Sequence, residues 1–196
     1  MSRTRTLSTA EARRATVVSG AIAAFAQGGF YGTTIADVAK RASISPAYVS
    51  KLFSSKSALF VAALDEAYER IVAGFERAAA QVDDPTPESL LMAMSVQYAE
   101  QVADRDLLML QVHAQAATAE PEIVEAVRRG VGKVVDYATS RTRVDGAAIQ
   151  NFIAFGQLCH VLTTIDAFDL DEPWAKMLTA GMLHHDSEGG GADGSG

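Results

Sequence analysis

The sequence predicts an all-α protein of about nine helices. Apolar residues recur three and four positions apart along most of the 196-residue chain, as they do on the buried face of a helix. The composition is 48% hydrophobic but only 7% aromatic, with five prolines, and it is rich in alanine and leucine, which favour helices. No stretch of useful length alternates apolar and polar residues. A helical protein is therefore expected, and a β-sandwich is not.

Charge is divided unevenly along the chain. The net charge is −7, yet residues 1–56 hold eight Lys and Arg against two acids, a balance of +6, and the remaining residues carry −13. A basic head on an acidic body indicates that the head alone binds a polyanion.

The basic N-terminus allows two interpretations. Arginines precede "VVSGAIAAFA", which imitates a signal peptide with an A-x-A cleavage site. The same residues also form an amphipathic stripe, and "STAE" before them is a capping box, so we favour a helix over residues 9–27. With Cys159 as the one cysteine and no apolar segment of about 20 residues, a cytoplasmic protein without membrane contact is expected.

Two short helices should come after the first one, which stops at Gly28 and Gly29. Thr34 caps the second helix, whose inward face holds Ile35, Val38, Ala39 and Ala42. Ser45 caps the third helix, and Pro46 occupies its first turn, where a missing N–H is harmless. The apolar side of this third helix consists of Val49, Leu52 and Phe53, which leaves the other side to Ala47, Tyr48, Ser50 and Lys51.

Two short helices joined by a tight turn form a helix-turn-helix, whose second helix fits the major groove of DNA. We therefore place a three-helix DNA-binding domain at residues 1–55. A larger helical domain should occupy residues 56–185, and the Gly-rich tail 186–196 should be disordered. The helices expected in the larger domain span 56–82, 87–102, 104–118, 121–143, 147–168 and 172–184.

Residues 21–60, "AIAAFAQGGFYGTTIADVAKRASISPAYVSKLFSSKSALF", resemble the DNA-binding head of TetR-family transcriptional regulators. The positions that match the family pattern are Thr33, Thr34, Ile35, Val38, Ala39, Ser45, Phe53 and Lys56. Two features depart from it. Ser43 stands where the turn often has glycine, and Tyr48-Val49-Ser50 replaces the usual Thr-Leu-Tyr, so a tyrosine that commonly touches phosphate is missing at position 50.

The resemblance implies a set of DNA-contacting residues: Thr33, Thr34, Ser45, Pro46, Ala47, Tyr48, Ser50, Lys51 and Lys56. Thr34, Ser45 and Lys56 should hold phosphates, whereas Lys51 and Tyr48 should face base edges. Arg3 and Arg5 are candidates for an arm in the minor groove. For each basic residue, Lys40 and Arg41 included, the alternative is a solvated surface charge.

The resemblance also implies a homodimer on a double-stranded palindromic operator, because one small head makes too few contacts for tight binding. The helix expected at 147–168 carries a stripe that suits a partner helix, formed by Phe152, Phe155, Gly156, Cys159 and Thr163. Pairing with the helix at 172–184 would give a four-helix interface, as in the family. The alternative is an internal core helix of a monomer.

A small-molecule effector is the third partner implied, bound between helices of the larger domain. The residues expected to line its pocket are Met92, Met94, Tyr98, Met109, Leu110, His113 and Phe155. Ordinary core packing is the alternative for each of them. In the family, effector binding tilts the fourth helix and releases the operator, and repression is the commoner outcome.

An enzyme is the main competing class of function. Cys159-His160 together with His113 could suggest a thiol or metal site, but the sequence has no H-x-x-x-H, C-x-x-C or E-x-x-H set. We therefore expect no catalysis, no metal and no cofactor. A helical interaction or architectural module that ignores DNA is the third interpretation, and steep salt dependence of duplex binding separates it from a regulator.

Overall fold

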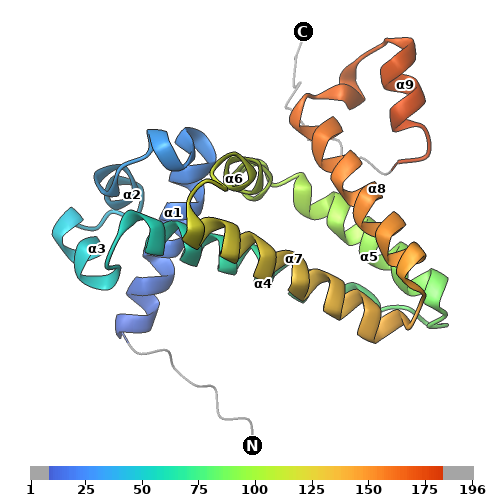
Figure 1. Ribbon diagram of the computed structural model, residues 1–196, viewed down its shortest axis with the longest axis horizontal. Helices are drawn as coiled ribbons and strands as arrows, with labels where there is room; N and C mark the ends of the chain where they lie inside the picture. Colours follow the sequence, from blue (N-terminus) through green and yellow to red (C-terminus); the bar gives the residue numbers. More distant parts are fainter. Residues whose placement is uncertain (1–8, 183–196) are drawn as a thin grey trace, which may run out of the picture.

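The computed structural model describes residues 9–182. Within them the chain forms nine α-helices and one short 3-10 helix, without a strand, so the all-α prediction is confirmed. Figure 1 shows α1, α2 and α3 gathered at one end of an elongated molecule, and α8 and α9 at the other. Arg3, Arg5 and the tail 186–196 lie outside the described residues.

The helix-turn-helix forms as its caps predict. Helix α2 (Ile35–Arg41) begins at Thr34, whose hydroxyl accepts a hydrogen bond from the amide of Asp37. Helix α3 (Pro46–Leu52) begins at Ser45, whose hydroxyl oxygen accepts from the amide of Tyr48 at 3.3 Å. Because both caps come from sequence-local hydrogen bonds, these two starts could be read from the chain alone.

Helix α1 (Thr9–Gly32) extends further than predicted. Gly29 interrupts it with φ 66° and ψ −179°, a conformation open mainly to glycine, and a last helical turn comes after it. The predicted glycine stop is therefore present, but residues 30–32, which were expected to lie outside the helix after that stop, form a further helical turn. That turn packs Phe30 against Phe60 of α4, with ring centroids 5.4 Å apart.

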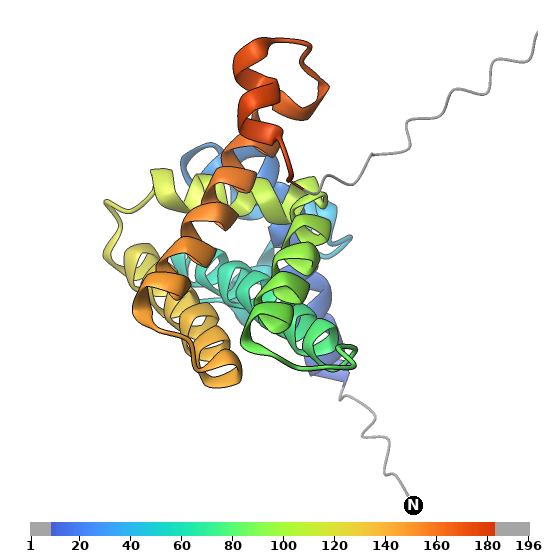
Figure 2. The same cartoon turned by 90° about the vertical axis from the view of Figure 1, so that its right-hand side faces the viewer.

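Five helices build the larger domain close to the predicted bounds: α4 (Lys56–Ala79), α5 (Pro87–Val102), α6 (Arg105–Ala116), α7 (Pro121–Thr142) and α8 (Gly146–Thr164). Helices α4 and α7 run side by side in the same direction. Two ion pairs join them, Asp65 with Arg129 at 3.3 Å and Glu69 with Lys133 at 3.1 Å. Figure 2 views the domain from its far end, where α4 lies between α5 and α7, and α8 packs on α5 and α7.

The C-terminal end differs most from the prediction. Helix α8 stops at Thr164 because Asp166 takes a left-handed conformation, φ 53°, and the 3-10 helix Ala167–Asp169 comes next. The last helix, α9 (Pro173–Thr179), has seven residues and does not fill the predicted span 172–184 within the described part of the chain. Both figures show α9 standing clear of the helices that form the core.

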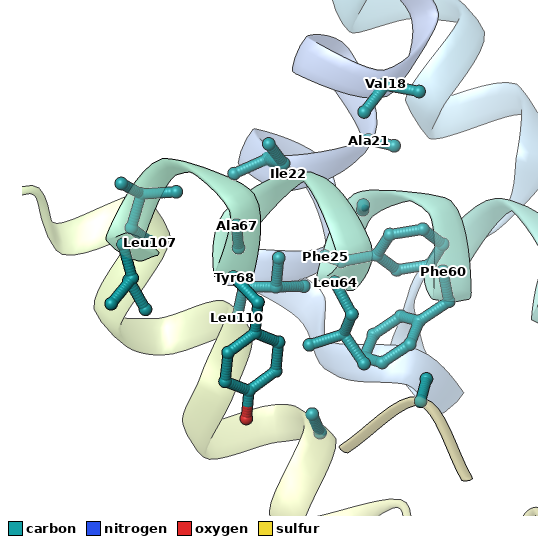
Figure 3. Close-up of a cluster of buried hydrophobic side chains, with 14 of the residues drawn as sticks. Val18, Ala21, Ile22, Phe25, Phe60, Leu64, Ala67, Tyr68, Leu107 and Leu110 are labelled. Atoms are coloured by element: carbon teal, nitrogen blue, oxygen red, sulfur yellow. The ribbon is translucent and has the colours of Figure 1, made fainter. Parts of the chain in front are cut away.

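One continuous apolar core joins the two ends of the molecule. Figure 3 shows α1, α4 and α6 contributing to a single cluster, in which Phe25, Phe60 and Leu110 are buried. Phe25 and Phe60 pack edge to face with centroids 4.7 Å apart. The head is thus seated on α4 and α6. No helix among the described residues is long and apolar enough to cross a bilayer.

Candidate nucleic-acid interface and ligand cavity

Helix α3 presents a polar face to solvent. Ala47, Ser50 and Lys51 are exposed, whereas Val49 is fully buried against the head. Tyr48 is half-buried, and the guanidinium carbon of Arg13 in α1 lies 5.5 Å from its ring centroid. The sequence predicted the exposed face, but the Arg13 contact depends on how α1 crosses α3 and could not be read from spacing.

The predicted phosphate ligands are placed unequally. Ser45 is exposed, and its hydroxyl accepts from Tyr48 while its own proton stays available for donation. Lys56 is half-exposed, with its ammonium nitrogen 4.5 Å from the centroid of the Phe30 ring. Pro46 is exposed at the start of α3. These three residues lie around the N-termini of α3 and α4, where backbone dipoles favour anions.

Thr33 and Thr34 are less well placed to contact DNA. Thr33 is only 3% exposed, and its hydroxyl donates to the carbonyl oxygen of Ala24 at 3.2 Å, so its side chain supports the head and does not reach solvent. The amide and hydroxyl of Thr34 both donate to the Asp37 carboxylate, at 2.8 and 2.6 Å. These bonds lower the pKa of Asp37. A phosphate at Thr34 must displace that carboxylate.

The turn between α2 and α3 explains one departure from the family pattern. Ser43 has φ 54°, in the left-handed region that glycine occupies without strain. The backbone therefore keeps the turn that glycine usually makes, and a serine adopts it. The departure at position 43 does not disturb the placement of α3.

A large cavity opens between α4, α5, α6, α7 and α8. Its volume is about 740 Å³, within the range of sites that hold drug-sized ligands. Its wall is mainly apolar and includes Phe75, Leu91, Val134 and Phe152. Polar groups enter it from Tyr68 and Tyr98 and from a few amides.

The predicted pocket residues divide into two groups. Met92, Tyr98 and Phe155 line the cavity as expected. Met94 and Leu110 are fully buried core residues, and neither they nor Met109 and His113 line this cavity. His113 instead packs on the kink of α1, where a Cβ at Gly29 would lie 2.9 Å from its Nδ1. Periodicity identified the right helices but not which side of each faces the cavity.

Comparison with known proteins agrees with this architecture. Residues 17–63, from α1 into α4, match the family described as bacterial regulatory proteins, tetR family. The head of the chain is thus a TetR-type DNA-binding domain. The matched segment contains the whole helix-turn-helix, α2 and α3, as in bacterial transcriptional regulators of that family. No curated protein sequence matches the chain significantly.

Solved structures of similar fold cover nearly the whole chain. A TetR-family regulator from Agrobacterium tumefaciens is 17% identical, covers 88% of this chain and 94% of its own, and superposes with a TM-score of 0.67. The regulator FadR from Bacillus subtilis, solved with stearoyl-CoA, is 12% identical over 86% and 99%, with a TM-score of 0.65. The fatty acid degradation regulator FadR from Bacillus halodurans is 18% identical over 86% and 99%, with a TM-score of 0.64. At these identities the likeness establishes the TetR-type fold alone.

Most of the predicted dimerisation stripe on α8 lines the cavity. Phe152, Gly156 and Cys159 line the cavity, with the Gly156 backbone against the Tyr98 ring, and Thr163 is half-buried. Phe155 is 49% exposed at the cavity mouth. The dimer stripe remains a prediction, and α8 is apolar nearly all round, so its periodicity does not distinguish a cavity side from an interface side.

A different apolar surface is exposed at the C-terminal end, and the sequence analysis missed it. It comprises Val161, Ile165, Leu170, Trp174, Met177 and Leu178, on α8, α9 and the segment between them. We call these six residues the α8–α9 surface. Met177 is 77% exposed and Val161 57%. For α8 the signal was present in the sequence as Val161, an apolar residue outside the predicted stripe.

Cys159 and His160 are buried on α8 and have structural roles. His160 is 3% exposed, and its Nε2 lies 3.1 Å from the carbonyl oxygen of Leu108, which ties α8 to α6. Burial lowers the pKa of His160 and raises the pKa of the Cys159 thiol. Within residues 9–182 no group of three or more His, Cys, Asp or Glu side chains is arranged to hold a metal ion.

Proposed function

We propose that this regulator is a homodimeric repressor that binds a palindromic operator and is released by a small molecule. The observation that carries the proposal is the exposed face of α3, where Lys51 and Tyr48 stand beside the cap of Ser45. A helix with this exposure and a phosphate-binding N-terminus has the geometry of a recognition helix in the major groove.

The α8–α9 surface supports the dimer. Its exposed side chains are large and apolar, and contiguous apolar surface of this kind commonly marks a protein interface. Two copies joined there would bring two α3 helices onto one duplex, and half-sites one turn apart would be read together. We therefore assign the dimer contact to this surface in place of the stripe predicted from sequence.

The cavity supports the proposal that a small molecule acts as effector. It is apolar and of ligand size, and FadR from Bacillus subtilis, which has the same fold, was solved with stearoyl-CoA. That comparison supports a ligand in this domain and does not identify it.

Two helices connect the cavity with the head. On α6, Gln111 and Gln115 line the cavity, while His113 packs on the kink of α1. On α4, Tyr68 lines the cavity, and Phe60, two turns earlier, packs on Phe25 of α1. A ligand that displaces either helix changes the separation of the two recognition helices in the dimer, and operator affinity falls.

Selection of duplexes from random DNA by the full-length protein tests the proposal. We expect a palindromic consensus, and we expect Lys51→Ala to lose about tenfold or more in affinity for it, as loss of a base contact does. Lys133→Ala is the matched control, because Lys133 is an exposed lysine on α7 paired with Glu69. Absence of any enriched sequence would favour an interaction module that does not bind operators, and equal affinity of the Lys51 and Lys133 variants would contradict a DNA contact by Lys51.

A further inference from the structure

The cavity is notable for the charges it lacks. Among residues 9–182, 24 line the cavity, and none of these is lysine, arginine or histidine. Glu88 is the one carboxylate among them, and it is exposed at the start of α5. An anionic ligand would therefore enter without a counter-charge, next to a carboxylate, in a domain that is itself strongly acidic.

Two hydroxyl groups in the wall are free. Tyr68 and Tyr98 both line the cavity, and neither hydroxyl has a hydrogen-bond partner among residues 9–182. In Figure 3 the Tyr68 oxygen points away from the other labelled side chains of the cluster. Burial raises the pKa of both phenols, so both carry a proton to donate at neutral pH. A hydroxyl in the cavity wall that bonds no protein group can donate to an acceptor on a ligand.

We infer that the cavity takes a neutral, mainly apolar organic molecule with a hydrogen-bond acceptor held by the hydroxyls of Tyr68 and Tyr98. This inference rests on the proposed effector role of the cavity and specifies its chemistry. Coenzyme A thioesters and free fatty acids fit poorly, because phosphates and carboxylates need arginine or lysine donors when taken out of water. A cation gains little from Glu88, whose exposed carboxylate is screened by solvent.

Three probes with one alkyl chain and different head groups test the charge preference. Dodecanol is neutral, dodecanoate is an anion and dodecyltrimethylammonium is a cation. Calorimetric titration of the full-length protein, below the concentration at which each probe forms micelles, should give the highest affinity for dodecanol. We expect dodecanoate to bind at least about tenfold more weakly, because its charge is left unpaired.

Tyrosine variants test the hydroxyl groups. Tyr68→Phe and Tyr98→Phe should each weaken dodecanol binding by about three- to tenfold, the range of one hydrogen bond. Tyr137→Phe is the matched control, since Tyr137 also packs near Phe75 but does not line the cavity. Gln157→Lys, which adds a cation to the wall at an exposed position, should raise dodecanoate affinity and leave dodecanol unchanged.

The outcomes separate this inference from the proposed function. Tightest binding of dodecanoate or of dodecyltrimethylammonium, no binding of any probe, or equal effects of the three tyrosine variants would overturn the inference. A dodecanol complex that keeps full affinity for the selected duplex would leave the ligand chemistry standing and would contradict release by the effector.

Discussion

The ring of Tyr68 in α4 lies against the backbone of Gly130 in α7. A Cβ at position 130 would come 2.1 Å from Cδ2 of the tyrosine, so no other residue fits without displacing the ring. Tyr68 is 7% exposed, and its hydroxyl belongs to the wall of the cavity. A single glycine thus fixes both the α4–α7 crossing and the place of a cavity hydroxyl.

Alanine at Gly130 should lower the free energy of unfolding by about 1–3 kcal/mol, because the extra methyl overpacks this crossing. Gly132, two residues further along the same helix, has nothing within 4 Å of an added Cβ. Gly132→Ala should therefore raise stability by up to about 1 kcal/mol through helix propensity. Urea denaturation measures both. Equal effects of the two substitutions would show that the close contact between Gly130 and the Tyr68 ring does not affect stability.

Arg13 and Tyr48 should act together in DNA binding. The Arg13 guanidinium lies over the Tyr48 ring and holds that side chain on the exposed side of α3. In a double-mutant cycle of Arg13→Ala and Tyr48→Ala, duplex affinity should show a coupling of about 0.5–1 kcal/mol. Arg14 is the control, since it lies over Phe53 and not over Tyr48. Coupling of Arg14 with Tyr48 as large as that of Arg13 would contradict a specific contact between Arg13 and Tyr48.

The α8–α9 surface should hold the dimer. Met177→Asp places a charge on its most exposed residue, and burial of an unpaired charge is strongly unfavourable. Sedimentation should then give the mass of one chain at concentrations where the parent protein gives two. Met92→Asp changes a methionine that is 62% exposed on α5 and should leave the dimer intact. A dimer that survives Met177→Asp and dissociates in Met92→Asp would place the interface elsewhere.

His160 should make stability depend on pH. Burial lowers its pKa below the ordinary value of 6.5, so the unfolded chain binds a proton more readily than the folded one. Its contribution is fully present above pH 6.5 and is lost as the pH falls from there through the folded pKa. Urea titrations at about pH 7.5 and about pH 5.5 should show this loss, and His160→Gln should reduce it. An unchanged pH dependence in the variant would assign the effect to other groups.

Capping hydrogen bonds within a few residues made several helix starts predictable from the sequence. The starts of α2, α3, α5 and α8 are fixed by capping side chains within a few residues, and each was placed correctly to within one residue. The glycine stop of α1 was also recognised, at Gly29. Residues 30–32, which were expected to lie outside the helix, form a further turn, because the turn at Phe30 is held by a ring of α4, far along the chain.

Tertiary contacts determine which side of each helix faces the cavity or the core, and the sequence alone did not show this. Helix α8 is apolar on most sides, so spacing alone could not tell its cavity side, with Phe152 and Gly156, from its exposed side, with Val161. His113 was grouped with the cavity because it lies on the right helix, yet it faces α1. The burial of Thr33 likewise results from a bond to Ala24, nine residues away.

The salt dependence of duplex affinity shows whether the head binds DNA phosphates. Affinity for the selected duplex should fall steeply between about 50 and 200 mM salt. Lys56→Ala should reduce the magnitude of the slope of log affinity against log salt by about one, while Lys133→Ala should leave that slope unchanged. Affinity that is insensitive to salt, or a Lys56 variant with the parent slope, would contradict a head that binds phosphates through the N-termini of α3 and α4.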